Sequence, residues 1–415
     1  MERYNPWWIG EKDYEYEKWE KSPIKWIPDI INEISLKPFS LNFLSGPRQV
    51  GKTTAIKILI YKLLENHDAK GIFYYSCDEL SDYKELGEVI DNYLSSRESW
   101  KIKKSFIFLD EITFVDDWWR TLKSRIDRGV FKNDVITITG SASIELLRQK
   151  EYFPGRRGYG KDCVLLPLRF SEYLTKIEKL PISFGEIRRI DENMKKNKLF
   201  EEKIKEGFYR YIQSGGFPLS IIDVKTKGKV TLQTIRTYLD WMRNDWVKLG
   251  KNEKYMKEVI SYIIRARGTA ISWNGIASET SINSPHTAQS YVEILEKMFV
   301  VKILYFLSPD GKIMYRKNKK VHFLDPLMYQ VFSEYVKEDY DLSQIYEALV
   351  ATTLGRFYPT YYWKNSTEVD VICKVDDEIV GFEVTKGIKR WRKPIFLKKA
   401  HLLDRDNIHL YLSAI

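Results

Sequence analysis

The segment LNFLSGPRQVGKTTAIKILIYKLLE (Leu41 to Glu65) limits the possible folds of this chain more than any other. An apolar run ends at Ser45, the pattern G-x-x-x-x-G-K-T follows, and an amphipathic stretch begins at Thr54. Glycines let the backbone turn its N–H groups toward a phosphate, and the start of a helix adds partial positive charge. This order predicts a right-handed parallel α/β sheet with a nucleotide at the carboxyl ends of the strands.

The residues of this loop have separate expected roles. Lys52 would reach the β- and γ-phosphates, and the Thr53 hydroxyl would complete the coordination of Mg²⁺. We therefore expect ATP and Mg²⁺ as cofactors. The predicted ATP-binding residues are Gly46, Pro47, Arg48, Gln49, Val50, Gly51, Lys52, Thr53 and Thr54.

A second motif, SFIFLDE (Ser105 to Glu111), is an apolar run that ends in two acids. Asp110 would hold Mg²⁺ through water, and Glu111 would polarise the water that attacks the γ-phosphate. Such a second acid is typical of ATPases with an extra strand between the two motifs. We assign that extra strand to GIFYYSC, Gly71 to Cys77.

Later motifs resemble a known family. A T-G-S strand end, a G-R turn at Gly155 and the segment PLRFSEYL (Pro167 to Leu174) follow the first two motifs in order. This order of motifs is similar to that of a prokaryotic family, found in archaea and bacteria, of AAA+ ATPases with a C-terminal domain of uncharacterised function. Arg169 stands where those proteins usually have serine. The segments SGGFP (Ser214 to Pro218) and FLDPLM (Phe323 to Met328) extend the resemblance over nearly the whole chain.

Two side chains would join Lys52 and Glu111 in the catalytic set. The run DVITITGSAS ends in the hydroxyls of Thr139, Ser141 and Ser143, where a sensor of the γ-phosphate would lie, and we choose Ser141. The resemblance implies that Arg156 is an arginine finger or phosphate sensor. A structural arginine in a glycine turn is the alternative.

The resemblance and the local patterns together predict several domains, as expected for 415 residues. The fold class is α/β, with an AAA+ P-loop NTPase sheet and helical lid before a winged-helix domain and a restriction-endonuclease-like α/β domain. The expected domains are an N-terminal lead segment (1–40), the ATPase core (41–180), the helical lid (181–250), the winged helix (251–340) and the nuclease-like domain (341–415).

The predicted winged helix contains helix-turn-helix spacing and then a hairpin around Pro309-Asp310-Gly311 with a basic stretch. The second helix would face a major groove, and the wing cations would meet phosphates. Protein contacts are the alternative role of such a domain. The predicted DNA-binding residues are His286, Gln289, Lys317, Lys319 and Lys320.

The tail is expected to form a helix, three strands, a helix (394–403) and a strand (408–414), the core of restriction-endonuclease-like folds. That resemblance places acids at Glu347, Asp370 and Glu383, where they would hold Mg²⁺ against a phosphate. Side chains alternate along a strand, so Thr385 shares a face with Glu383 whereas Lys386 does not. Either Lys386 or Lys389 enters the site through a bulge, or the domain binds nucleic acid without cutting it.

Composition limits the setting and the partners. The net charge of +10 favours an anionic partner, with DNA preferred over a membrane. Cys77, Cys163 and Cys373 are far apart, which fits a reducing cytoplasm, and the N-terminus lacks the apolar run of a secretion signal. We expect a cytoplasmic chain with no membrane partner.

The sequence thus predicts a Mg²⁺-dependent ATPase of AAA+ type that is coupled to DNA. A signalling switch that rarely hydrolyses ATP, a protein remodeller that binds its partner through the winged helix, and an active metal-dependent DNA nuclease are the alternatives. The oligomeric state stays open.

Overall fold

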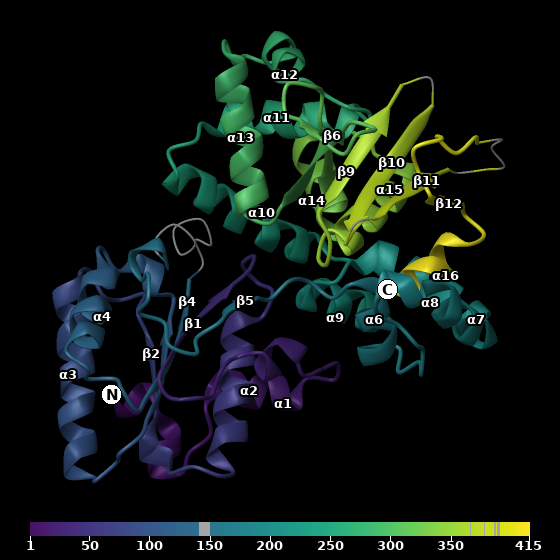
Figure 1. The fold of residues 1–415 in the computed structure, drawn as a ribbon. Coiled ribbons are helices and arrows are strands. Elements are labelled where there is room, and N and C mark those ends of the chain that lie inside the picture. Colours follow the sequence, from purple (N-terminus) through teal and green to yellow (C-terminus); the bar gives the residue numbers. More distant parts are fainter. Residues whose placement is uncertain (141–149, 366, 377, 386, 388–390) are drawn as a thin grey trace. The chain divides into compact units, whose positions relative to one another are not determined.

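The computed structural model describes residues 1–415 except 141–149, 366, 377, 386 and 388–390. The chain divides into two compact units, which we call the N-terminal unit (Met1–Leu166) and the C-terminal unit (Pro167–Ile415). Figure 1 shows the elements of each unit. No helix within the described residues is both long and apolar enough to cross a membrane.

The described strands of the N-terminal unit form a five-stranded parallel sheet in the order β2-β3-β4-β1-β5. This confirms the expected α/β fold. The strand that lies between β1 and β3 in the sheet is β4, so our assignment of this extra strand to Gly71–Cys77 was wrong. The order of strands along the chain does not give their order in the sheet. The strands are β1 (Ser40–Ser45), β2 (Ile72–Ser76), β3 (Phe106–Asp110), β4 (Val135–Thr139) and β5 (Asp162–Val164).

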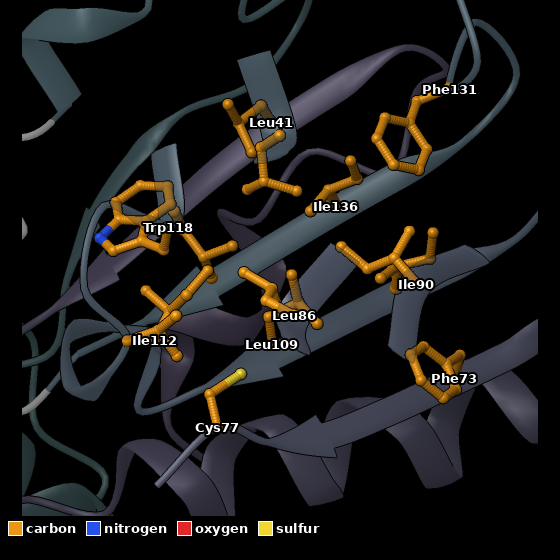
Figure 2. Close-up of a cluster of buried hydrophobic side chains, with 14 of the residues drawn as sticks. Leu41, Phe73, Cys77, Leu86, Ile90, Leu109, Ile112, Trp118, Phe131 and Ile136 are labelled. Carbon is orange, nitrogen blue, oxygen red and sulfur yellow. The ribbon is translucent and has the colours of Figure 1, made fainter. Parts of the chain in front are cut away.

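Helices α1 (Tyr14–Lys21), α2 (Lys52–Leu64), α3 (Tyr83–Ser99) and α4 (Trp118–Asp127) accompany this sheet. Alternate residues of β3 and β4, such as Leu109 and Ile136, face a buried cluster to which α3 contributes Leu86 and α4 contributes Trp118 (Figure 2). Each fully buried side chain of this size stabilises the fold by about 1.5–3 kcal/mol. This packing fixes β3, whose last residue is Asp110.

The N-terminal lead segment covers the edge of β2. Both polar atoms of the Asn5 side chain pair with the backbone of Tyr74, donating to its carbonyl (3.0 Å) and accepting from its N–H (2.7 Å). The indole nitrogens of Trp7 and Trp8 both donate to the Ile72 carbonyl. These side chains satisfy backbone groups of an edge strand that would otherwise be open to pairing with another chain.

The C-terminal unit combines a largely helical part with a seven-stranded sheet among its described residues, in the order β12-β11-β10-β9-β6-β7, with β8 also paired to β6. Strand β6 pairs in parallel with β9, so this sheet joins strands from ranges 251–340 and 341–415, which we expected to form separate domains. The strands are β6 (Val301–Leu307), β7 (Ile313–Met314), β8 (Lys320–Phe323), β9 (Thr360–Lys364), β10 (Glu368–Val375), β11 (Glu378–Val384) and β12 (Lys399–Leu403).

The helices of this unit follow the expected order up to the tail. Helices α11, α12 and α13 come directly before β6, and α8 packs against both α14 and α16. The bounds are α6 (Phe170–Lys176), α7 (Ile190–Asn197), α8 (Glu201–Ser214), α9 (Pro218–Lys227), α10 (Leu232–Lys248), α11 (Glu253–Arg265), α12 (Trp273–Glu279), α13 (Pro285–Lys297), α14 (Pro326–Val336), α15 (Leu342–Leu354) and α16 (Ile408–Ser413).

The end of the tail differs from the sequence prediction. Residues 399–403 form β12, which pairs in parallel with β11, whereas we expected a helix over 394–403. Residues 408–413 form α16 rather than a strand, and this helix is buried throughout. A short apolar run has no clear period when every side is buried, so helix and strand cannot be told apart from its sequence.

Asp325 joins two motifs that lie more than a hundred residues apart in sequence. Its carboxylate accepts hydrogen bonds from the N–H of Gly216 (2.8 Å), in SGGFP, and from the N–H of Leu327 (2.9 Å), at the start of α14. Burial raises the pKa of Asp325 to about 6. The motifs SGGFP and FLDPLM therefore form one structural unit within this fold.

Gly215→Ala is expected to cost several kcal/mol of unfolding free energy. The backbone of Gly215 has φ +64°, and an added Cβ would lie 1.9 Å from Oδ1 of Asp325. Gly228→Ala is the control without such a contact, because Gly228 (φ +75°, ψ −3°) has no atom within 4 Å of its Cβ and carries only the left-handed backbone cost of about 1–2 kcal/mol. Gly215 has ψ −162°, so its own backbone conformation adds to the loss there. Urea unfolding of both variants measures the difference, and equal losses would contradict the proposed contact.

Candidate functional site

The phosphate-type loop connects β1 to α2. Gly46 has φ +145°, and a Cβ there would lie 2.1 Å from the Leu165 carbonyl oxygen, so only glycine fits. Lys52 is the first residue of α2, and its side chain is buried. Its Nζ donates hydrogen bonds to the carbonyls of Gly46 (2.9 Å) and Pro47 (3.0 Å). The ammonium therefore lies inside the loop, next to backbone that could surround a phosphate.

Asp110 ends β3 and is the central acceptor of the site. It is 2% exposed and accepts hydrogen bonds from Thr53 Oγ1 (2.7 Å), Tyr74 OH (3.0 Å) and Thr139 Oγ1. These donors come from α2, β2 and β4, so three elements converge on one carboxylate. The structure thus brings together the two residues that we predicted from sequence as metal ligands, Thr53 and Asp110.

Glu111 follows Asp110 in a left-handed backbone conformation, φ +56°. Its N–H donates to Thr139 Oγ1 (3.1 Å), so the Thr139 hydroxyl bridges the two acids of the motif. Thr139 was one of three hydroxyl residues considered for the phosphate sensor, and Ser141, the one that we predict, lies outside the described residues.

Tyr74 is a site residue that sequence analysis did not identify. Burial, together with Asp110, raises the pKa of its hydroxyl, which therefore stays a hydrogen-bond donor at neutral pH. The Lys57 ammonium lies 3.2 Å from the centroid of the Tyr74 ring and 2.9 Å from Asp13 Oδ2, at the start of α1. Strand β2 carries three hydroxyl side chains, those of Tyr74, Tyr75 and Ser76, and the sequence does not indicate which of them reaches Asp110.

The oxygen donors of this site fit Mg²⁺. A carboxylate and a hydroxyl are hard ligands, and the Thr53 hydroxyl already lies 2.7 Å from Asp110 Oδ2. Thr53 and Asp110 would hold the ion, the hydroxyl directly and the carboxylate through water. When bound, Mg²⁺ would neutralise charge on the phosphate oxygens.

The Arg156 side chain forms its hydrogen bonds with residues outside the phosphate-binding loop. Its Nε donates to Asp127 Oδ1 (2.5 Å), at the end of α4, and its guanidinium also donates to the Pro154 carbonyl. Arg156 lowers the pKa of Asp127. This contact is consistent with the alternative that we left open, a structural arginine in a glycine turn.

The predicted DNA-binding residues fall into two groups. His286 and Lys317 are exposed, and Gln289 is partly exposed with its amide nitrogen bonded to Glu293 (2.6 Å). Lys319 (5% exposed) and Lys320 (1%) are buried, and therefore they cannot form the surface phosphate contacts predicted for them. A run of basic residues shows where positive charge lies in the sequence, but it does not show which of the side chains are buried in the fold.

Lys320 instead lies among acids of the tail. Its Nζ is 2.7 Å from Glu347 Oε1, 2.9 Å from Glu368 Oε1 and 2.7 Å from Asp370 Oδ1. Burial alone would lower the pKa of Lys320, but the carboxyl groups outweigh it and keep the ammonium charged. Two of the three predicted nuclease-like acids, Glu347 and Asp370, are therefore neutralised by a side chain from β8.

The third predicted acid, Glu383, is 2% exposed on β11. Asp370 is tied to the same strand by a hydrogen bond from the N–H of Val384 (2.8 Å). Lys386 and Lys389 lie outside the described residues, so the bulge that would bring either one into the site stays untested. Within the described part of the chain, no group of three potential ligands is arranged to hold a metal ion.

Two segments match known protein families. Residues 39–174 match a family described as an AAA domain, and residues 205–334 match a family described as a domain of unknown function. The AAA match covers the loop, Asp110, Glu111 and all five strands of the N-terminal sheet.

Individual proteins show more distant similarity. An uncharacterised protein of Methanocaldococcus jannaschii is 26% identical over 78% of this chain and 67% of its own length, and one of Haemophilus influenzae is 23% identical over 84% of each. Among solved structures, a Walker-type ATPase of Pyrococcus abyssi has a TM-score of 0.41 at 14% identity, covering 78% of this chain and 95% of its own. The ORC2 protein of Aeropyrum pernix has the same TM-score at 13% identity, covering 75% and 97%.

The residues that match the AAA family include all the strands of the N-terminal sheet. A five-stranded parallel sheet with the loop after β1 and two adjacent acids at the carboxyl end of β3 is the arrangement of a P-loop nucleotide-binding domain. The N-terminal unit therefore has the fold of a P-loop nucleotide-binding domain, and residues 39–174 of the chain are similar to a family described as an AAA domain.

Proposed function

We propose that this chain binds ATP with Mg²⁺ and hydrolyses it in the N-terminal unit. The observation that carries the proposal is the position of Asp110, which accepts hydrogen bonds from Thr53 in the loop and from Thr139 on β4. A ligand of Mg²⁺ is thereby held against the loop that would cradle the phosphates. Lys52 would bind the β- and γ-phosphates after leaving the carbonyls of Gly46 and Pro47.

Glu111 is the proposed general base. It follows Asp110 directly and lies at the carboxyl end of β3, the edge of a parallel sheet where the reacting phosphate would bind. Its carboxylate would polarise the attacking water, and the Thr139 hydroxyl fixes its backbone. Ser141 stays the proposed sensor of the γ-phosphate, and Arg156 would have to leave Asp127 to act as an arginine finger or phosphate sensor. Thr139 is proposed as a positioning residue, because it contacts both Asp110 and the Glu111 backbone.

We further propose that ATP hydrolysis is coupled to DNA through helices α11–α13 and the hairpin of β6 to β8, a winged-helix arrangement. Arg316 and Lys317 are exposed at the hairpin, and His286 is exposed at the start of α13. Exposed cations that can release counterions from DNA support such a contact. The helical segment 181–250 is the proposed lid, and the chain is proposed to act in the cytoplasm.

Changing both Arg316 and Lys317 to Ala is expected to weaken duplex binding at every sequence. The slope of log K against log salt should fall by about 2, because each lost phosphate contact removes about 0.9. Fluorescence anisotropy at several salt concentrations measures this slope. The control changes Lys229 and Arg236 to Ala, exposed cations outside the hairpin with the same total charge. Equal slopes in the two double variants would instead favour protein contacts at the hairpin.

A further inference from the structure

The polar cluster around Lys320 has the composition of a metal site with an ammonium at its centre. We call Lys320, His322, Glu347, Glu368 and Asp370 the Lys320 cluster. The Lys320 side chain is 2% exposed, and the side chains of Glu347, Glu368 and Asp370 are 13%, 24% and 9% exposed. All three carboxyl groups contact the same nitrogen, so Nζ occupies the point on which their oxygens converge.

His322 is directed into this cluster without satisfying either ring nitrogen. Its side chain is 0% exposed, Nε2 lies 3.4 Å from Glu347 Oε1, and neither nitrogen has a hydrogen-bond partner within the described part of the chain. Burial, with help from Lys320, lowers the pKa of His322 to about 3, so the ring is neutral. A buried neutral imidazole with a free lone pair is a common metal ligand.

The backbone encloses the cluster. Lys320 and His322 are on β8, Glu347 is on α15, and Glu368 and Asp370 are on β10, so the donors are fixed by three elements. The loop after α11 approaches so closely that a Cβ on Gly268 would lie 2.9 Å from Glu347 Oε2. An ion in place of the ammonium would face oxygen donors from α15 and β10, and the His322 ring of β8 lies 3.4 Å from one of these oxygens.

The distances from Lys320 Nζ to the carboxylate oxygens show how far the ligands would have to move if a metal ion replaced the ammonium. The N–O distances of 2.7–2.9 Å are those of charge-assisted hydrogen bonds. Divalent transition ions bind such ligands at about 2.0–2.2 Å, so the donors would need to move inward by roughly 0.6 Å. Carboxylate oxygens and one imidazole suit Mn²⁺.

We propose that the Lys320 ammonium takes the place of a divalent cation in the C-terminal unit and closes this site to metal. The carboxyl groups that could bind a metal are committed to Lys320, and Glu368 also pairs with Lys364 (2.9 Å). On this account the C-terminal unit does not cut nucleic acid by a metal-dependent route. Removal of the ammonium opens a divalent site made by Glu347, Glu368, Asp370 and His322.

The test compares Lys320→Met with the wild type. Methionine has a similar length but no charge, so the site keeps its volume and loses its cation. Nucleotide-free, chelator-treated protein is titrated with Mn²⁺, and free Mn²⁺ is followed by electron paramagnetic resonance. The variant is expected to bind one more Mn²⁺ than the wild type. Adding Asp370→Asn or His322→Ala to it should weaken that binding by at least about tenfold.

The wild type controls for Mn²⁺ that binds elsewhere, because any such ion is common to both proteins. A folded Lys320→Met protein that binds no additional Mn²⁺ would overturn the proposal. Mn²⁺ binding by the wild type that is lost on Asp370→Asn would overturn it as well, because the site would then be open in the presence of Lys320. If the variant is unfolded in chelator, Mn²⁺ should restore its circular dichroism spectrum and a cooperative thermal transition. Failure of Mn²⁺ to restore the fold would also overturn the proposal.

Discussion

Glu111→Gln is expected to keep ATP bound and to lower the turnover number by about a hundredfold or more. The amide cannot accept a proton from the attacking water, whereas Asp110 keeps its hydrogen bonds to Thr53 and Thr139. Fluorescent-nucleotide titration gives the binding constant, and phosphate release gives the rate. Glu88→Gln, an exposed acid on α3, is the matched control. Loss of ATP binding in parallel with turnover would contradict the role of Glu111.

Lys52→Ala is expected to weaken ATP binding by at least about a hundredfold, close to 3 kcal/mol. Alanine removes the cation proposed to bind the β- and γ-phosphates, and it also removes the bonds to the Gly46 and Pro47 carbonyls. The same nucleotide titration measures the loss. Lys62→Ala, an exposed lysine on the same helix, should bind ATP as the wild type does. An unchanged affinity in Lys52→Ala would remove the loop from the proposed site.

The central part of the nucleotide site could be predicted because its geometry is local. A loop between one strand and one helix is specified by consecutive residues, and Gly46 has the backbone that its motif requires. Asp110 could be placed because carboxyl ends of parallel strands meet at one edge. Tyr74 could not, because its contact depends on β2 lying next to β3, a neighbour relation that no local pattern contains.

The C-terminal unit shows the opposite case. Lys320 is in a basic stretch and reads as a surface cation, but its partners Glu347 and Asp370 come from distant segments. The pairing of β8 with β6 and of β6 with β9, together with the packing of α15 against β8 and β10, brings these charges together. At α16, burial on every side removes the period that distinguishes a helix from a strand. Strand β12 is only partly buried, and its parallel pairing with β11 is a long-range contact that its own sequence does not contain.

The rate of ATP hydrolysis, measured with and without duplex DNA, tests the account most directly. Phosphate release is followed at saturating ATP with Mg²⁺, and an excess of chelator is the blank. We predict Mg²⁺-dependent turnover by the wild type that exceeds that of Glu111→Gln and increases when DNA is added. Wild-type turnover no higher than that of Glu111→Gln would contradict hydrolysis at this site, and a rate unchanged by DNA would contradict the coupling.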